Sequence, residues 1–523
     1  MKPLNILRNR SQAGSGSGSG GEDTGGLQVA KSLDENVAYL KERLGAGESF
    51  DILYRVIEVG GKRAAFFYVN NFTPQVQGTL LMHFWEMLPK EELTVDTLHK
   101  FFHRHADTIQ ASTTRSWDKV ITYVLSGPVI LFFDGIDEAV VLDIRSYPVR
   151  AIEEPELEKV ERGSRDGFVE TMSFNVVLIR RRLRDPNLRM AIVEVGSRSH
   201  TDVVVSYIKD IADPELVQAV KERLKRINID GVPMAERGVS ELLDVKNSWN
   251  PFPRVRYTER PDVAAIHLLE GHVLILVDTT CSVLIAPSTI WHHLQHAEEY
   301  HDTPLVGTFI RWVRYIGVFA SVFLTPVWLL VALQPGLLPP ALAFIGPSHP
   351  SKIPLLIQFL LADIAIDMIR QATIHIDTAL ATAVGIVAAV VVGQYAAQIG
   401  LMAPEVIIYT AVAAVGTFLT PSFELSMANR LVRIFLLILT GLFRLPGLIA
   451  GTLATFVLLV TSRSFGVPYL WPLIPFSWPA LKAVLLRSPV PVSTIRPGAL
   501  RPLDATRHAV PEPARKPRGG RGR

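Results

Sequence analysis

Charged and polar side chains interrupt the most apolar part of this chain. The stretch LLADIAIDMIRQATIHID, residues 360–377, carries Asp363, Asp367, Arg370 and Gln371. On a helix these four positions follow the spacing i, i+4, i+7 and i+8, so they share one face. An aspartate at the centre of a bilayer costs about 2.5–3.5 kcal/mol on the insertion scale. We therefore expect this face to contact protein, water or lipid headgroups rather than lipid tails.

The polar face has three interpretations. The first is an amphipathic helix at a membrane surface, with Asp367 and Arg370 as a local ion pair. The second is a re-entrant or pore-lining helix whose carboxylates attract cations. The third is a metal site that adds His375 and Asp377, which the pattern disfavours because those two residues lie beyond the helical register.

The segments around this stretch are long and apolar, and a membrane-spanning helix needs about 20 such residues. The candidates are 316–333 with Pro326 as a kink, 379–403, 406–423, 434–443 and 445–462. Arg444 and the Pro446-Gly447 pair separate the last two, which form either one long kinked helix or two short ones. The sequence predicts an all-α polytopic membrane domain over 311–465, with four to six crossings.

Small residues recur at every fourth position of the segment 379–403. A ridge of this kind lets helix backbones approach closely in lipid, within the chain or between copies of it. The ridge consists of Ala381, Gly385, Ala389, Gly393 and Ala397. Beside it lie Gln394 and Gln398, which we assign to an aqueous path together with Asp363, Asp367, Arg370 and Gln371. Glu405 and Glu424 either form rings at the mouths of that path or cap helices.

The first 310 residues resemble a soluble protein, with charges of both signs. Three segments read as β-hairpins: 50–70 with a Gly60-Gly61 turn, 127–144, and 271–287. Each follows helical material, which predicts two cytosolic α/β subdomains, 27–150 and 151–310, of α+β or α/β class. Arg180, Arg181, Arg182 and Arg184 end a predicted helix over 166–185 and read as a solvated face or a subunit contact. The net charge of +3 gives no argument for nucleic acid, and we expect none as a partner.

The two ends of the chain differ in composition from the rest. Residues 1–26 form a flexible glycine/serine-rich spacer, without the apolar core of a signal peptide. Residues 466–523 are first proline-rich and then basic. Such a basic excess favours the cytosolic side of a membrane. We therefore place both ends of the chain in the cytosol.

Enzyme signatures do not appear. No GxxxxGK[ST] loop accompanies the strand VILFFD, and the single cysteine, Cys281, excludes an internal disulfide. In WHHLQHAEEYH, His292 and His296 are one helical turn apart with Glu299 nearby, a spacing that zinc can use. His293 stands where a zinc protease has its glutamate base, so packing is the better interpretation. We expect no catalytic residue, no metal ligand and no cofactor.

Three long blocks carry a resemblance to a known family. They are YPVRAIEEPELEKVERGSRDGFVETMSFNVVLIRRRLRDPNL (147–188), VGSRSHTDVVVSYIKDIADPELV (195–217) and WNPFPRVRYTERPDVAAIHLLEGHVLILVD (249–278). They resemble the signature blocks of the GerA spore germination protein family, the A subunits of germinant receptors. Within it, WNPFPRVRYTERPD, QHAEEYH and PYLWPLIPF are most similar to the stage V sporulation protein AF branch. The likeness extends from about residue 50 to 500.

The resemblance implies a multi-pass protein of the spore inner membrane, with its soluble half facing the spore core. It further implies a homo-oligomer, pentameric in family models, around a path that releases monovalent cations and amplifies the germinant signal. A small integral membrane protein, other germination proteins and membrane lipid are the implied partners. Two alternatives remain: the A subunit of a nutrient receptor, and a non-conducting scaffold for germination proteins. A secondary transporter would predict inverted repeats, which the sequence does not display.

Overall fold

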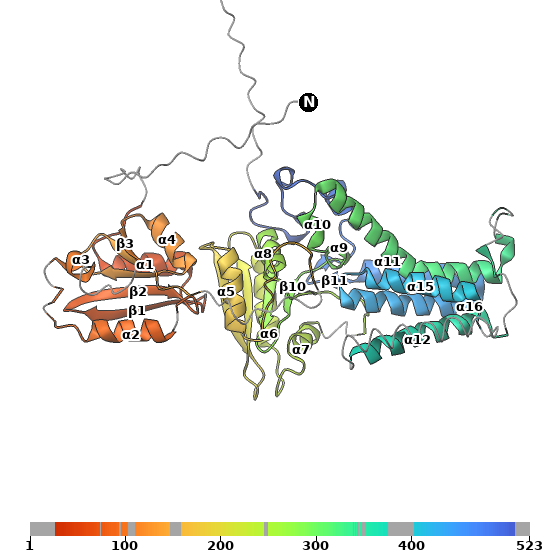
Figure 1. The fold of residues 1–523 in the computed structure, drawn as a ribbon, viewed down its shortest axis with the longest axis horizontal. Coiled ribbons are helices and arrows are strands. Elements are labelled where there is room, and N and C mark those ends of the chain that lie inside the picture. The colour runs from red at the N-terminus through yellow and green to blue at the C-terminus, as the bar shows by residue number, and fades with distance from the viewer. Residues whose placement is uncertain are drawn as a thin grey trace, which may run out of the picture. The chain divides into compact units, whose positions relative to one another are not determined.

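The computed structural model describes a chain that separates into two compact units (Figure 1). The first unit comprises residues 1–42, 54–69 and 73–145, and the second comprises 43–53, 70–72 and 146–523. The residues described are 27–73, 75–90, 92–93, 96–102, 110–146, 158–244, 249–337, 339, 341, 345–347, 352–374 and 402–507.

The first unit is a five-stranded sheet in the order β1-β2-β4-β5-β3. Successive side chains on a strand point to opposite faces, and the aromatic residues of β2 and β4 follow this rule. Phe66 lies edge-on to Trp85 of α2, whereas Phe132 packs against Trp117 of α4. Helices thus cover both faces. The elements are α1 (Leu33–Leu44), β1 (Ile52–Val59), β2 (Lys62–Val69), α2 (Gln75–Glu86), α3 (Thr97–Lys100), β3 (Ala111–Thr114), α4 (Trp117–Ser126), β4 (Val129–Phe133) and β5 (Ala139–Leu142).

The second unit begins with another five-stranded sheet, in the order β6-β7-β9-β10-β8. Apolar residues of α5 and α8 pack on one face and those of α6 and α7 on the other. The elements are α5 (Met172–Arg182), β6 (Leu188–Val195), β7 (Thr201–Ile208), α6 (Pro214–Lys225), α7 (Ala235–Leu243), β8 (Arg256–Thr258), α8 (Pro261–Glu270), β9 (Val273–Val277), β10 (Val283–Ala286), α9 (Ile290–Leu294) and α10 (Glu298–His301).

The hairpins predicted from sequence are confirmed. β1 and β2 flank Gly60 and Gly61, β4 pairs with β5, and β9 pairs with β10 in antiparallel register. The interpretation of the arginine run as a solvated face is wrong for Arg180. This side chain is 1% exposed and donates to the Asp51 carboxylate from Nε at 2.9 Å. The carboxylate lies far away in sequence, so helix periodicity gave no sign of it.

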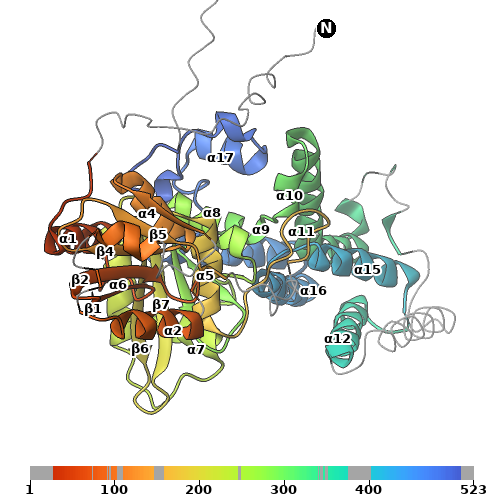
Figure 2. The same cartoon turned by 60° about the vertical axis from the view of Figure 1, so that its left-hand side comes forward.

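A bundle of apolar helices completes the second unit and is seen from two directions in Figures 1 and 2. Its central contacts are between α11 and α16 and between α11 and α15. Among the described helices, α11 and α16 are long and apolar enough to cross a membrane. The elements are α11 (Pro304–Leu333), α12 (Leu355–Ile374), α15 (Pro404–Phe418), α16 (Phe423–Thr461) and α17 (Trp478–Leu485), with the strands β11 (Arg463–Ser464) and β12 (Val467–Pro468) and the 3-10 turns Pro335–Leu337, Val490–Val492 and Gly498–Leu500.

The element α16 reverses its direction at Arg444, whose backbone has φ 55° and ψ −133°. A Cβ on Gly447 would lie 2.0 Å from the carbonyl oxygen of Leu439, although eight residues of continuous helix span about 12 Å. The two halves therefore pack side by side. Of the two alternatives for 434–462, the structure has two helices joined by a sharp reversal, with Pro446 in the first turn after it.

Candidate functional site in the polar layer of the helical bundle

Arg433 is the centre of a polar layer inside the apolar bundle. Its side chain is 1% exposed, and its partner Asp363 on α12 is 3% exposed. The guanidinium donates to both carboxylate oxygens, from Nη2 at 2.8 Å and from Nε at 3.3 Å. Its Nη1 donates to the Ser321 carbonyl of α11 at 2.9 Å and to Thr417 Oγ1 of α15 at 3.3 Å. One side chain thus links α11, α12, α15 and α16.

A second ion pair lies one helical turn away. The carboxylate of Asp367 on α12 pairs with the guanidinium of Arg430 on α16. The negative charge of Asp367 is therefore balanced by an arginine on another helix, α16. Arg370, the expected local partner, places its guanidinium 4.7 Å from the ring centroid of Phe423. Both aspartates of the predicted polar face thus contact protein.

The remaining predicted pore residues divide into three groups. Gln371 is exposed on α12. Glu405 and Glu424 lie in the first turns of α15 and α16, where a carboxylate interacts favourably with the helix dipole. Gln394 and Gln398 lie outside the described residues, as do the small-residue ridge at 381–397 and the metal candidates His375 and Asp377.

Glu405 and Glu424 lie at opposite ends of the bundle. Ala403, just before Glu405, donates its N–H to Gln358 at the start of α12. Ser422, just before Glu424, contacts His293 Nδ1 at 3.1 Å, beside the second sheet. The polar layer of Asp363 and Arg433 lies between these ends, because Arg433 is ten residues into α16. A path along the bundle would pass Glu424, then the two ion pairs, then Glu405.

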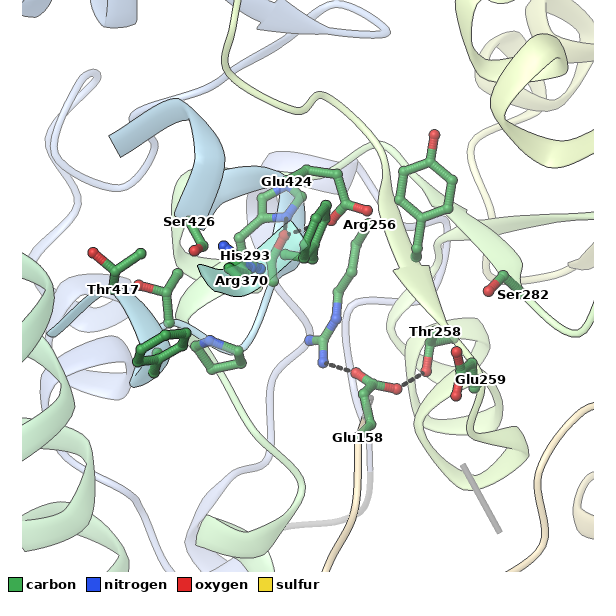
Figure 3. Close-up of a pocket in the computed structure, with 16 residues that line it drawn as sticks. Glu158, Arg256, Thr258, Glu259, Ser282, His293, Arg370, Thr417, Glu424 and Ser426 are labelled. Atoms are coloured by element: carbon green, nitrogen blue, oxygen red, sulfur yellow. Dashed lines mark hydrogen bonds and ion pairs between the residues drawn. The ribbon is translucent and has the colours of Figure 1, made fainter. Parts of the chain in front are cut away.

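A pocket of about 170 Å³ opens where the second sheet meets the bundle (Figure 3). Glu158 lies on one wall and accepts hydrogen bonds from Arg256 Nη2 at 3.1 Å and from Thr258. The wall formed by the bundle contributes Arg370, Thr417 and Glu424. This volume suits several waters or a small ion with its hydration shell. The pocket is therefore lined by residues of both the second sheet and the bundle, and its Thr417 also contacts Arg433 of the polar layer.

His293 also lines this pocket. Its two ring nitrogens lie 3.2 Å from Ser288 Oγ and 3.1 Å from Ser422 Oγ. Burial lowers the pKa of His293 to about 3, so the ring is neutral at physiological pH. A neutral imidazole donates on one nitrogen and accepts on the other. His293 therefore fastens the start of α16 to the second sheet without adding charge.

The motif QHAEEYH forms a junction of charges rather than the zinc site considered above. Glu299 is fully buried and pairs with two arginines of α11, Arg311 at 2.6 Å and Arg314. Arg311 Nη1 also donates to the carbonyl of Val484 on α17 at 2.8 Å. Both oxygens of the Glu299 carboxylate thus pair with arginines of α11. His296 accepts a backbone N–H from Glu298 at 3.2 Å.

Comparison with known proteins identifies the family. Residues 38–499 match the family described as Bacillus/Clostridium GerA spore germination protein. The chain belongs to the GerA family. The prediction made from the sequence blocks is confirmed, and the match includes every residue of the polar layer.

The similar GerA proteins cover nearly the whole chain. Stage V sporulation protein AF of Bacillus subtilis (strain 168) is 44% identical over 481 residues, which are 92% of this chain and 97% of that protein. Spore germination protein KA of the same organism is 32% identical, over 93% of this chain and 90% of that protein. The higher identity to the first agrees with the predicted branch.

A solved structure also matches in part. The crystal structure of the N-terminal domain of the A subunit of the Bacillus megaterium spore germinant receptor GerK3 is 28% identical. The match covers 50% of this chain and 97% of the GerK3 chain, with a TM-score of 0.40.

The sequence alone identified one half of the polar layer. Asp363 and Asp367 stood out because carboxylates are rare in apolar segments, whereas Arg430 and Arg433 precede the segment 434–443 and read as its flanking charges. A comparison of the spacing between acidic residues in one apolar segment and basic residues beside another would have identified these ion pairs. Asp363 and Asp367 are four residues apart, and Arg430 and Arg433 are three apart, so both pairs rise by one helical turn.

Proposed function

We propose that this GerA protein is a membrane protein of spore germination that assembles into an oligomeric channel and releases monovalent cations from the spore core. Membership in the GerA family carries the proposal, together with the names of its relatives, which refer to spore germination and sporulation. The buried polar layer supports the channel in particular, because ionisable residues inside an apolar bundle mark ion pathways by default.

The surface of the bundle supports a location in a membrane. Apolar side chains on α11 and α16 are widely exposed, among them Ile316, Phe319, Leu442, Phe443 and Ile449. Large apolar side chains exposed in this number favour a cover of lipid or protein. In the proposed arrangement the bundle spans the spore inner membrane in several passes, and the two α/β sheets face the spore core.

The ion pairs supply a way to close such a path. Asp363 and Asp367 attract cations only when their charges are not balanced by Arg433 and Arg430. We assign the paired arrangement to the closed channel, in which the carboxylates are neutralised across helices. Opening would separate α12 from α16, so that water and a cation replace the guanidinium groups. The pocket in Figure 3, with Glu424 on its wall, would then be the entrance from the core.

Ion release from germinating spores tests this assignment. Removing one member of a buried ion pair leaves an uncompensated charge, whereas replacing both with apolar residues of similar size is often neutral for stability. The informative variant is therefore Asp363→Leu combined with Arg433→Met. A channel lined by Asp363 predicts slower release of K⁺ and Na⁺, or a changed ratio between them, at unchanged protein level.

The matched control is Asp34→Leu with Arg63→Met, an exposed ion pair of the first unit at 2.9 Å. It removes the same two charges far from the bundle in sequence and should leave release normal. Normal rate and ion ratio in the Asp363/Arg433 variant would contradict the pore assignment.

The alternatives differ in their requirements. A non-conducting scaffold needs the soluble sheets and tolerates the paired substitution, but a chain truncated after Arg311 would disturb its partners. A nutrient receptor A subunit would make release depend on a particular germinant. Chemical cross-linking of the purified chain, followed by mass measurement, tests the proposed homo-oligomer, and co-purification tests the proposed small membrane partner.

A further inference from the structure

A cluster of three histidines and one glutamate lies where α8, the turn after it and α9 meet. His267 and Glu270 come from α8, His272 precedes β9, and His292 lies on α9. Ligand atoms of the four residues all lie within 4.8 Å of one another. The ring centroids of the histidines are 4.9–5.8 Å apart. This cluster is separate from the polar layer and takes no part in the proposed ion path.

Two of the histidines are buried and have free ring nitrogens. His267 Nδ1 lies 2.8 Å from the Val263 carbonyl, which leaves Nε2 without a hydrogen-bond partner although the residue is 5% exposed. His272 is fully buried, and one of its ring nitrogens faces the Pro287 carbonyl while the other has no hydrogen-bond partner. A buried nitrogen without a partner costs free energy unless something binds it. Metal-binding histidines typically bond a backbone carbonyl through the other nitrogen, as His267 does.

His292 is held by its cap. The Thr289 N–H donates to His292 Nδ1 at 3.0 Å, so the neutral ring carries its proton on Nε2. Binding of a cation through Nε2 would therefore shift that proton to Nδ1, where Thr289 Oγ1 at 3.0 Å can accept it.

Glu270 supplies the negative charge. Its Oε2 lies 3.9 Å from His272 Nε2, too far for a hydrogen bond, while its Oε1 pairs with Arg507. The guanidinium thus holds the carboxylate in place from outside, as the hydrogen-bond partners of ligands do at metal sites. The other cation nearby, Arg256, donates to the His292 carbonyl at 2.8 Å and is balanced by Glu158 at 3.1 Å.

We propose that His267, Glu270, His272 and His292 bind one divalent ion of the zinc class. Three imidazoles and one carboxylate match the ligand chemistry of Zn²⁺, and four protein ligands make a closed, structural site. Tetrahedral ligands at about 2.0–2.2 Å from the metal stand roughly 3.4 Å apart. The widest gap between ligand atoms, 4.8 Å, must therefore close by about 1.4 Å when the ion binds.

The ion would connect three parts of the second unit. It would hold α9, which leads to α11, against α8, and through Glu270 and Arg507 it would hold the C-terminal segment at 490–507 in place. We therefore assign the site a structural role at the passage from sheet to bundle. The proposal is independent of ion conduction and stands or falls by metal binding.

Metal content of the full-length protein tests the site. The chain is purified in detergent, stripped with a chelator, and titrated with Zn²⁺ alone. We expect one equivalent to bind and to raise the midpoint of thermal unfolding. His267→Gln and His272→Gln should each weaken Zn²⁺ binding at least about 100-fold. His296→Gln, which changes a nearby histidine outside the cluster, should bind as the unaltered chain does.

Co²⁺ gives a readout that needs no variant and so does not depend on their folding. A tetrahedral site in the unaltered chain gives intense visible d–d absorption at one equivalent, which Zn²⁺ abolishes. Protease cleavage within 490–507 should slow at least about tenfold when Zn²⁺ is added. Either of two results overturns the proposal: no stoichiometric Zn²⁺ or Co²⁺ in the unaltered chain, or equal Zn²⁺ affinity in His272→Gln and His296→Gln.

Discussion

At the scale of single residues, buried arginines of the second unit form ion pairs with acidic residues that are distant in the sequence. Arg180 pairs with Asp51, Arg311 with Glu299, and Arg433 with Asp363. Arginine suits such sites because its planar fork donates several hydrogen bonds and keeps its charge. Each of the three also donates to a backbone carbonyl, so it fixes a strand or a helix as well as its acid.

Glu299 gives the first prediction. Glu299→Gln removes one buried negative charge and leaves Arg311 and Arg314 close together without compensation. Breaking a buried ion pair in this way costs about 3–5 kcal/mol. We expect the midpoint of thermal unfolding, measured on the purified protein in detergent, to fall by several degrees.

The neighbouring residue provides the control for that experiment. Glu298 is only half-buried and accepts the backbone N–H of Glu161 at 3.0 Å. Glu298→Gln makes the same chemical change and should shift the midpoint by less than one third as much. Equal shifts in the two variants would show that the arginines do not depend on the Glu299 charge.

At the scale of helices, α11 and α15 cross with their backbones in close contact. A Cβ on Gly416 of α15 would lie 2.1 Å from the carbonyl oxygen of Gly317 on α11. Two glycines thus face each other where the helices cross, and the contact places Thr417 beside Arg433. Small residues at a crossing let helices pack through their backbones when no hydrophobic drive exists between them.

The second prediction concerns this crossing. Gly416→Ala forces α11 and α15 apart, and overpacking of this kind costs about 1–3 kcal/mol. Thermal unfolding should therefore occur at a lower temperature than in the unaltered chain. Gly336→Ala is the control, because nothing lies within 4 Å of a Cβ at that position. A midpoint as high in Gly416→Ala as in Gly336→Ala would contradict the close crossing.

Periodicity and turn chemistry predicted the local elements well, and the partners of buried charges poorly. The hairpin at Gly60-Gly61 and the helix through Pro326 were readable because each is set by residues adjacent in sequence. Arg433 and Asp363 are separated by 70 positions, so neither segment alone shows the pair, and only a comparison of charge spacing between the two segments would have found it. The histidine cluster was missed for the same reason, since His292 was compared with His296 and not with His267.

At the scale of the whole second unit, the C-terminal segment returns to the α/β sheet. Arg496 Nε donates to the Leu269 carbonyl at 2.7 Å, and the Leu503 N–H donates to the Ile211 carbonyl at 2.9 Å. Arg507 then pairs with Glu270. The segment therefore covers the end of α8 and the loop after β7, although the sequence predicts it only as a proline-rich and basic tail.

The third prediction is a comparison of two truncations. A chain that ends at Pro489 loses all of these contacts, whereas one that ends at Arg507 keeps them. At about 0.5–1.5 kcal/mol for each hydrogen bond, the first should lose about 2–4 kcal/mol of stability. Hydrogen exchange of the amides of Ala212 and Gly271 should become faster in the shorter chain only. Equal exchange in the two truncations would contradict a structural role for the segment.

The contact of Arg496 with Leu269 joins residues 227 positions apart, and the described helices of the bundle lie between them in sequence. A ribosome makes the second sheet long before it makes the segment that covers α8. The sheet thus leaves the ribosome without the partners that the carbonyls of Ile211 and Leu269 find in this segment, and it acquires them only after the bundle has been synthesised. This sheet therefore obtains its full set of contacts only after α17, the last α-helix that the structure describes, has been translated.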